Sequence, residues 1–258
     1  MKGTVIKTFF DKHYPLDTAY EWDNVGLQIG TLNKTITGIL IALDVTKDVV
    51  EEAIEKQCNL IIAHHPIIFS PLKRLTTDAY KGKMIEILIT EDIAVYVSHT
   101  NYDLGSTGMN QVLADQIGLE NQAVLEMVSE THGIGRIGTI LPMPLEKAVN
   151  VIKEALGVET ARLITNTPEK LVETVAISGG SGASHMMAAK MQGADLYLTG
   201  DVSYHRAHDM LQAGLTALDI GHYAEHHFAQ ALKEELKQAG VDVPMYESAL
   251  NLDPFVFV

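Results

Sequence analysis

Cysteine is nearly absent from this sequence of 258 residues, which contains only Cys58. One cysteine cannot form a disulfide within the chain, which excludes the small disulfide-stabilised secreted folds and fits a reducing compartment. Long hydrophobic runs are also missing, since LIIA at 60–63 and IAVYV at 93–97 are far shorter than the roughly 20 residues of a membrane span. The start, MKGTVIKTFFDKHYP, carries Lys, Asp and His where a signal peptide needs an apolar core. We therefore expect a cytoplasmic protein.

Basic residues are scarce as well. The sequence has 19 Lys and Arg against 33 Asp and Glu, a formal net charge of −14. Such a chain repels polyanions, which argues against non-specific nucleic-acid binding but leaves open a local site for one small phosphate ester. Hydrophobic residues make up 47% of the chain and charged residues 20%, the balance of a folded globular protein.

Short apolar runs alternate with amphipathic segments from residue 37 onward. Continuous apolar strands that alternate with helices predict mainly parallel sheets buried on both faces. In the first half we expect strands at 37–46, 59–63 and 93–98, and helices at 47–57, 81–92 and 109–120. In the second half we expect strands at 133–144, in ARLIT, in TVAIS, at 195–200 and at 215–221, and helices at 144–157, in MMAAKMQ, at 204–214 and at 223–240.

The segment 121–132 interrupts this alternation and is the candidate boundary between two α/β lobes, 1–125 and 126–258. Each lobe repeats the order helix, strand, polar cluster, helix, strand, polar cluster. The clusters are HHP and HTNYD in the first lobe, and TGD and GHYAE in the second. Open α/β sheets bind ligands at strand carboxyl ends, so the pattern predicts a degenerate internal repeat with its site between the lobes.

Metal-ligating residue types gather in these clusters. His64 and His65 end a strand before Pro66, where both imidazoles can turn toward one site. Each cluster also has a structural alternative: a surface role for the histidine pair, helix capping for Asp103, and a favourable acidic first helical turn for Glu225. Which histidine near Glu225 would coordinate stays open among 222, 226 and 227, although the preceding glycine favours His222.

Together the clusters supply three histidines and two carboxylates without a thiolate. Such nitrogen and oxygen donors suit zinc, iron, manganese or cobalt rather than calcium or a structural Cys-type zinc site. Five protein ligands are too many for one catalytic ion that keeps an open position. They suit two ions that share a bridging carboxylate.

Across nearly its whole length the sequence resembles the dinuclear-metal-centre family whose members are often labelled GTP cyclohydrolase 1 type 2 homologues. The ordered matches are EWDNVGLQIG (21–30), ALDVT (42–46), HHP (64–66), SHTNYD (98–103), GIGRIG (133–138), ISGGSG (177–182), TGD (199–201) and GHYAE (221–225). The resemblance implies a two-lobed α/β fold assembled as a toroidal homohexamer. It also implies two divalent ions held by His64, His65, Asp103, His222 and Glu225. Some members carry an additional domain between the lobes, and the short segment 121–132 predicts that this chain lacks it.

Other motifs have weaker interpretations. Trp22, Asp23 and Asn24 are candidates for the rim of the site, against a plain turn and a strand that packs Leu27 and Ile29. GGSGAS at 179–184 can cradle an anion, but a tight strand-to-helix turn is favoured because the lysine of a P-loop is missing. Asp201 and His99 are the candidate acid–base residues, with helix capping as the alternative for Asp201.

Three functions remain open on this basis. The leading hypothesis is a metal-dependent hydrolase. The family resemblance implies that its reaction is hydrolytic opening of the guanine ring of GTP. The second is a nucleotide phosphoesterase, for which Lys73 and Arg74 are the nearest basic candidates. The third is a metal-binding scaffold or metal-handling protein without turnover. Release of phosphate, a change in the purine ultraviolet spectrum, or neither would distinguish them.

Overall fold

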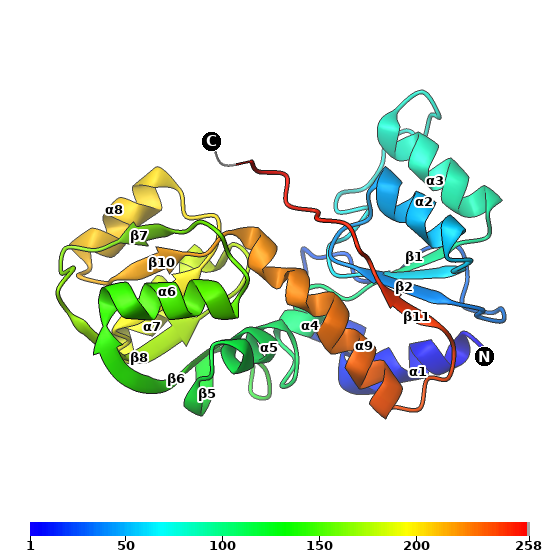
Figure 1. Cartoon of the computed structure of the whole chain (residues 1–258). Coiled ribbons are helices and arrows are strands. Elements are labelled where there is room, and N and C mark those ends of the chain that lie inside the picture. The colour runs from blue at the N-terminus through cyan, green and yellow to red at the C-terminus, as the bar shows by residue number, and fades with distance from the viewer. Residues whose placement is uncertain (257–258) are drawn as a thin grey trace. The chain divides into compact units, whose positions relative to one another are not determined.

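The computed structural model describes residues 1–256 and divides into two compact α/β units (Figure 1). Unit 1 comprises Met1–Tyr102 and Phe228–Leu252, and unit 2 comprises Asp103–His227 together with the end of the chain from Asp253. Each unit has its own sheet and hydrophobic core. The α/β class inferred from the alternating pattern is thus confirmed.

The sheet of unit 1 is mainly parallel and has five strands in the order β1-β4-β3-β2-β11. Neighbours from β4 to β11 pair in parallel, and β1 pairs with β4 in the antiparallel sense. β2, β3 and β4 are buried along their whole length, as their unbroken apolar sequences require. The strands are β1 (Gly26–Ile29), β2 (Ile39–Ala42), β3 (Leu60–Ala63), β4 (Ala94–Val97) and β11 (Met245–Glu247).

Helices cover both faces of this sheet. Figure 1 shows α2 and α3 on one side and α1 and α9 on the other. On the first side, Leu40, Ile61 and Val95 pack in one core with residues of α2 and α3. On the second side, the ring of Phe10 stacks on that of Tyr96, with 4.4 Å between centroids. The helices are α1 (Thr4–His13), the 3₁₀ turn η1 (Leu16–Thr18), α2 (Lys47–Glu55), α3 (Tyr80–Thr90) and α9 (Phe228–Gln238).

Unit 2 contains a six-stranded sheet in the order β5-β6-β8-β9-β10-β7. Its centre, β8-β9-β10, is parallel, and the outer pairings are antiparallel. The parallel centre places the carboxyl ends of three strands at one edge. The strands are β5 (Glu120–Met127), β6 (Gly133–Pro144), β7 (Arg162–Ile164), β8 (Leu171–Ile177), β9 (Leu196–Thr199) and β10 (Ala217–Asp219).

The helices of unit 2 range from the four residues of α4 (Thr100–Asp103) to the 11 residues of α6 (Leu145–Ala155). Ser203 caps α8 by accepting from the backbone N–H of Arg206 at 3.4 Å. The remaining elements are α4 (Thr100–Asp103, where the chain enters unit 2), α5 (Met109–Gln116), α6 (Leu145–Ala155), η2 (Gly182–His185), α7 (Met186–Met191), α8 (Tyr204–Gln212) and η3 (His222–His227). None of the helices in residues 1–256 combines the length and apolar character that crossing a membrane requires.

Several details differ from the sequence-based expectations. The segment 121–132 contains most of strand β5, in which only Leu125 is buried, as expected of an outer strand. The expected helix at 223–240 is a 3₁₀ segment, η3, followed by α9. Leu27 is 43% exposed and does not pack inward, whereas Ile29 is buried.

Candidate metal centre

In unit 1 the polar residues lie where β2, β3 and β4 end. These strands are parallel, so their carboxyl ends meet at one edge of the sheet. The pairing continues past the strands, because His65 N donates to the carbonyl of Leu43 at 2.9 Å and Ser98 N to that of Ala63 at 3.0 Å. Asp44, the histidine pair and His99 are therefore held on neighbouring chain segments.

Each histidine of the HHP motif has its Nδ1 atom engaged by an oxygen. His64 Nδ1 lies 2.8 Å from the carbonyl oxygen of Ser98, and His65 Nδ1 lies 2.8 Å from Oδ1 of Asp44. These oxygens accept, so Nδ1 carries the proton and the lone pair is on Nε2. A carboxylate or carbonyl behind the imidazole is the usual orientation of a metal-binding histidine.

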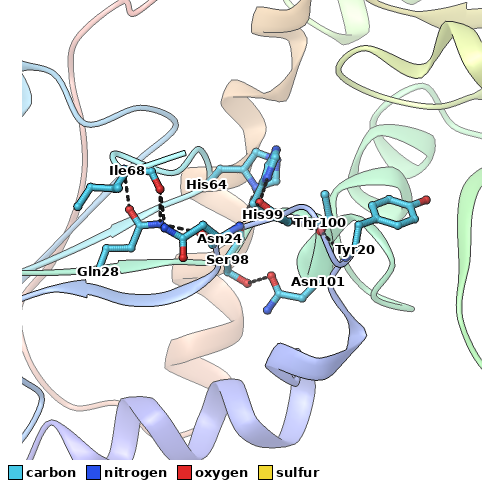
Figure 2. Close-up of polar contacts among 10 residues, drawn as sticks. Tyr20, Asn24, Gln28, His64, Ile68, Ser98, His99, Thr100 and Asn101 are labelled. Atoms are coloured by element: carbon cyan, nitrogen blue, oxygen red, sulfur yellow. Dashed lines mark hydrogen bonds and ion pairs between the residues drawn. The ribbon is translucent and has the colours of Figure 1, made fainter. Parts of the chain in front are cut away.

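His99 has the same arrangement and stands beside the pair. Its Nδ1 lies 2.9 Å from Oδ1 of Asp23, whose other oxygen accepts from the backbone N–H and the hydroxyl of Thr100 at 3.0 and 2.5 Å. The rings of His64 and His99 are 5.2 Å apart (Figure 2). His64, His65 and His99 each offer a ring nitrogen within 4.8 Å of the others, close enough to hold a metal ion.

The Asp23 carboxylate predicts a specific pH dependence of stability. Burial raises its pKa, but the hydrogen bonds from His99 and Thr100 outweigh burial and lower the pKa from 3.8 to about 2. A carboxyl group with a lower pKa in the folded state stabilises the fold above its unfolded pKa, and this stabilisation is lost as the pH falls through the folded pKa. We expect Asp23→Asn to lower the free energy of unfolding at neutral pH by about 2 kcal/mol.

Urea unfolding of metal-free protein checks this expectation. The difference between wild type and Asp23→Asn should shrink as the pH falls from 3.8 to about 2. Asp78→Asn, in the exposed loop before α3, is the matched control and should change stability little at any pH. A loss in Asp23→Asn that stays constant with pH would contradict the assignment.

Unit 2 contains a second group of ligand-type residues at the edge formed by β8, β9 and β10. His222 Nδ1 lies 2.7 Å from Oδ2 of Asp201, and His222 Nε2 lies 3.2 Å from Oε2 of Glu225. His222 and Glu225 are both in η3, and side chains three residues apart eclipse in a 3₁₀ helix, which explains why they align. Burial raises the pKa of Asp201, but hydrogen bonds from His222 and Ser181 lower it below its usual range.

The glycine-rich loop makes room for Glu225, which is only 3% exposed. A Cβ atom on Gly179 or on Gly180 would come within 2.9 Å of Oε1 of this glutamate. Gly179 N donates to Oδ1 of the buried Asn110 at 3.0 Å, and Asn110 Nδ2 donates to the backbone carbonyl of Asp103 at 3.1 Å. One buried amide thus ties the Asp103 segment to the loop beneath Glu225.

The structure therefore collects the sequence candidates in two groups. His64, His65 and His99 lie together in unit 1. In unit 2, His222 pairs with Glu225, and Asn110 links Asp103 to the adjoining loop. His226 and His227 instead direct ring nitrogens toward the backbone carbonyls of Tyr223 and Leu156.

Three contributors were not predicted from the sequence: Asp44, which orients His65, the link made by Asn110, and the contact of the glycine loop with Glu225. Asp44 could have been found, because it lies in the ALDVT motif just past a strand end. Asn110 carried no such signal, since nothing in a helix sequence indicates which distant backbone an amide will reach.

Comparison with known proteins agrees with the family resemblance found in the sequence. The model of the Duf34/NIF3 (NGG1p interacting factor 3) family matches residues 1–254. Proteins named GTP cyclohydrolase 1 type 2 homolog are similar to this chain: that of Lactococcus lactis is 39% identical over 99% of both chains, and that of Streptococcus pneumoniae 38% identical over 99% of both. The crystal structure of a Bacillus cereus protein related to NIF3 superposes with a TM-score of 0.93 at 32% identity, covering 100% of this chain and 99% of that one.

Proposed function

The chain belongs to the Duf34/NIF3 family, and from that premise we propose that it is a divalent-metal protein that catalyses hydrolysis. One observation carries the proposal. Four histidines of the candidate centre, His64, His65, His99 and His222, each have Nδ1 held by a carbonyl or carboxylate oxygen. This arrangement fixes the direction of each ring and leaves Nε2 as the atom that would bind a metal ion or, at His99, a proton.

We propose that His64, His65, Asp103, His222 and Glu225 hold two ions jointly. Chain connectivity supports a contribution from both units. The chain leaves unit 1 after Tyr102 and returns at Phe228. The rings of these two residues lie 6.1 and 5.0 Å from that of His64. Asp103 directly follows the first of them, and Glu225 precedes the second by three residues.

The donor set fits zinc, iron, manganese or cobalt. It consists of imidazole nitrogen and carboxylate oxygen, with no thiolate among the candidates. Bound divalent ions would lower the pKa of water and polarise the substrate. Such cations would also compensate the negative charge of the buried Glu225 carboxylate.

Two further residues of the chain would orient a metal ligand and transfer a proton. Asp201 accepts from His222 Nδ1 and would fix the tautomer and direction of that ring, so a positioning role suits it better than that of a base. His99, held by Asp23 and adjacent to the histidine pair, would hold or release a proton at its Nε2.

The names of the relatives point to one reaction to test first, hydrolytic opening of the guanine ring of GTP. One water adds across a ring C–N bond, and that bond breaks. We expect the metal-loaded protein to change the ultraviolet spectrum of GTP, and His65→Ala to reduce the rate at least a hundredfold. His132→Ala, at a partly exposed histidine in the turn before β6, is the matched control and should retain the wild-type rate.

Two outcomes would change the assignment. Phosphate release without a spectral change in the purine would identify a phosphoesterase. No turnover of any nucleotide by fully loaded protein would leave a metal-binding scaffold. We also propose that the protein assembles as a homohexamer, which light scattering checks by a mass six times the chain mass of 28.2 kDa.

A further inference from the structure

The only tryptophan of the chain, Trp22, stands at the tip of a rigid turn. Asp23 N donates to the carbonyl of Tyr20 at 2.9 Å and closes the turn. Tyr20 N donates to the hydroxyl of Thr100 at 3.1 Å (Figure 2). Asp23 accepts from His99 and Thr100. Both ends of the turn are thus attached to the segment that carries His99. The indole is nevertheless 58% exposed.

A second ring is positioned beside Trp22 from the HHP loop. Gln28 and Asn24 clamp the backbone of Ile68: Ile68 N donates to Gln28 Oε1 at 2.8 Å, and Asn24 Nδ2 donates to the Ile68 carbonyl at 2.5 Å. Figure 2 shows both amide side chains turned toward Ile68. The clamp fixes the next residue, Phe69, whose ring lies 5.9 Å from that of Trp22 and is 50% exposed.

These rings form an aromatic platform, defined here as Tyr20, Trp22 and Phe69. Tyr20 stacks on Trp22 with centroids 5.5 Å apart and planes within 17°. The edge of the platform reaches the histidines, because the ring of Trp22 lies 6.2 Å from that of His99. A planar ligand stacked on the indole would therefore have an edge next to the candidate metal centre.

The chain next to the platform is exposed and basic. All residues from Phe69 to Lys81 are exposed, and within this segment Lys73 and Arg74 are the only adjacent basic pair of a chain with a net charge of −14. They follow Phe69 by four and five residues, so their Cα atoms lie at most roughly 14–18 Å from that of Phe69. A fixed apolar surface beside a basic pair matches a ligand that has a flat ring and an anionic tail.

The stability of the fold does not explain why the rings of the platform are exposed. A soluble protein gains by burying large aromatic rings, and here hydrogen bonds to both supporting segments hold two of them in water beside the reactive groups. Aromatic side chains held in this way commonly stack nucleic-acid bases, whichever base is present.

We propose that the platform binds the substrate through its ring: a nucleotide-like molecule whose heteroaromatic base stacks on Trp22 and contacts the Phe69 ring, which is tilted by 49° to the indole, and whose phosphate lies toward Lys73 and Arg74. The inference rests on the proposed function, because it assigns the surface that binds the substrate of the same centre. It also has a readout independent of metal and of turnover.

Trp22 is the only tryptophan, so tryptophan fluorescence reports on the platform alone. Excitation at the red edge of the indole band avoids absorption by guanine. Guanosine monophosphate should quench this emission saturably, in metal-loaded and in chelator-treated protein. Ribose 5-phosphate and inorganic phosphate, which lack a base, should not.

Variants separate the parts of the surface. Phe69→Ala should weaken guanosine monophosphate binding roughly tenfold or more while metal content stays at the wild-type value. Leu75→Ala, in the same exposed segment and 55% exposed, is the matched control and should bind as wild type does. Lys73→Ala with Arg74→Ala should weaken the nucleotide but not the free nucleoside.

Equal responses to the nucleotide and to ribose 5-phosphate would overturn the proposal. So would unchanged nucleotide binding in Phe69→Ala. A Phe69→Ala protein that keeps its nucleotide affinity but loses its oligomeric state would identify the platform as a contact between copies instead. Failure of the metal centre would appear separately, as unchanged metal content in His65→Ala.

Discussion

Gly180→Ala is expected to weaken divalent-metal binding at least tenfold while the protein stays folded. Gly180 has a φ of +55°, and a Cβ there would lie 2.9 Å from Oε1 of Glu225. The added Cβ would meet the end of a flexible side chain, so the Glu225 carboxylate can move aside while the backbone stays in place. The displaced carboxylate would no longer lie in line with His222.

Gly193→Ala provides a matched control. Gly193 also has a positive φ, +79°, but a Cβ there meets nothing within 4 Å. Both variants should lose about 1–2 kcal/mol of stability from the backbone conformation, and only Gly180→Ala should lose metal affinity. Competition with a chromogenic chelator measures the affinity, and urea unfolding measures the stability. Equal affinities in the two variants would show that Glu225 is not a ligand.

Phe228→Ala is expected to have the largest effect on stability. Phe228 is fully buried at the start of α9, and its ring lies 5.0 Å from the rings of both His64 and Tyr102. Truncating a buried phenylalanine costs about 3–5 kcal/mol, a large part of the stability of a typical domain. The substitution would also remove the ring that packs against the His64 imidazole, so metal affinity should fall as well.

Leu236→Ala separates the two effects. Leu236 is equally buried, about two turns further along α9, and its truncation should cost a similar 2–5 kcal/mol. Thermal unfolding of metal-free protein should place the two variants close together. Metal affinity should fall in Phe228→Ala and stay near the wild-type value in Leu236→Ala. The same loss of affinity in both variants would mean that general destabilisation, and not the packing of Phe228 against His64, determines metal affinity.

The sequence was most informative for the buried parallel strands. β2, β3 and β4 are unbroken apolar runs because both of their faces are covered, and residues with ligand chemistry follow directly at their ends. The strand ends therefore indicate His64, His65 and His99 as candidates from the amino-acid pattern alone.

Long-range pairing was not accessible from the sequence. β11 is only three residues long, yet it joins the sheet of unit 1 through parallel pairing with β2, about two hundred residues earlier. The boundary predicted at residue 125 stays a prediction. Nothing in the local sequence indicates that α9 and β11 pack in the same unit as the first helices and strands. The 3₁₀ geometry of η3 was equally hidden, because HYAEHHF continues smoothly into a helical pattern.

The contacts that orient the candidate ligand side chains were also not predictable from the sequence. The sequence around Asp23 favours a turn, and the contact of this residue with His99 joins positions 76 apart in the chain. The glycine loop has the pattern of a tight turn, and its contact with Glu225 emerges only from the folded chain. In both cases the residue type fits several roles, and the tertiary structure selects one.

Metal content per chain, measured by elemental mass spectrometry after reconstitution with zinc, iron or manganese, shows whether the chain holds two ions. About two equivalents should be found in the wild type, and fewer in His65→Ala and in Glu225→Ala. His132→Ala should match the wild type. A wild-type protein that retains no metal, or ligand variants that retain as much as the wild type, would contradict the account.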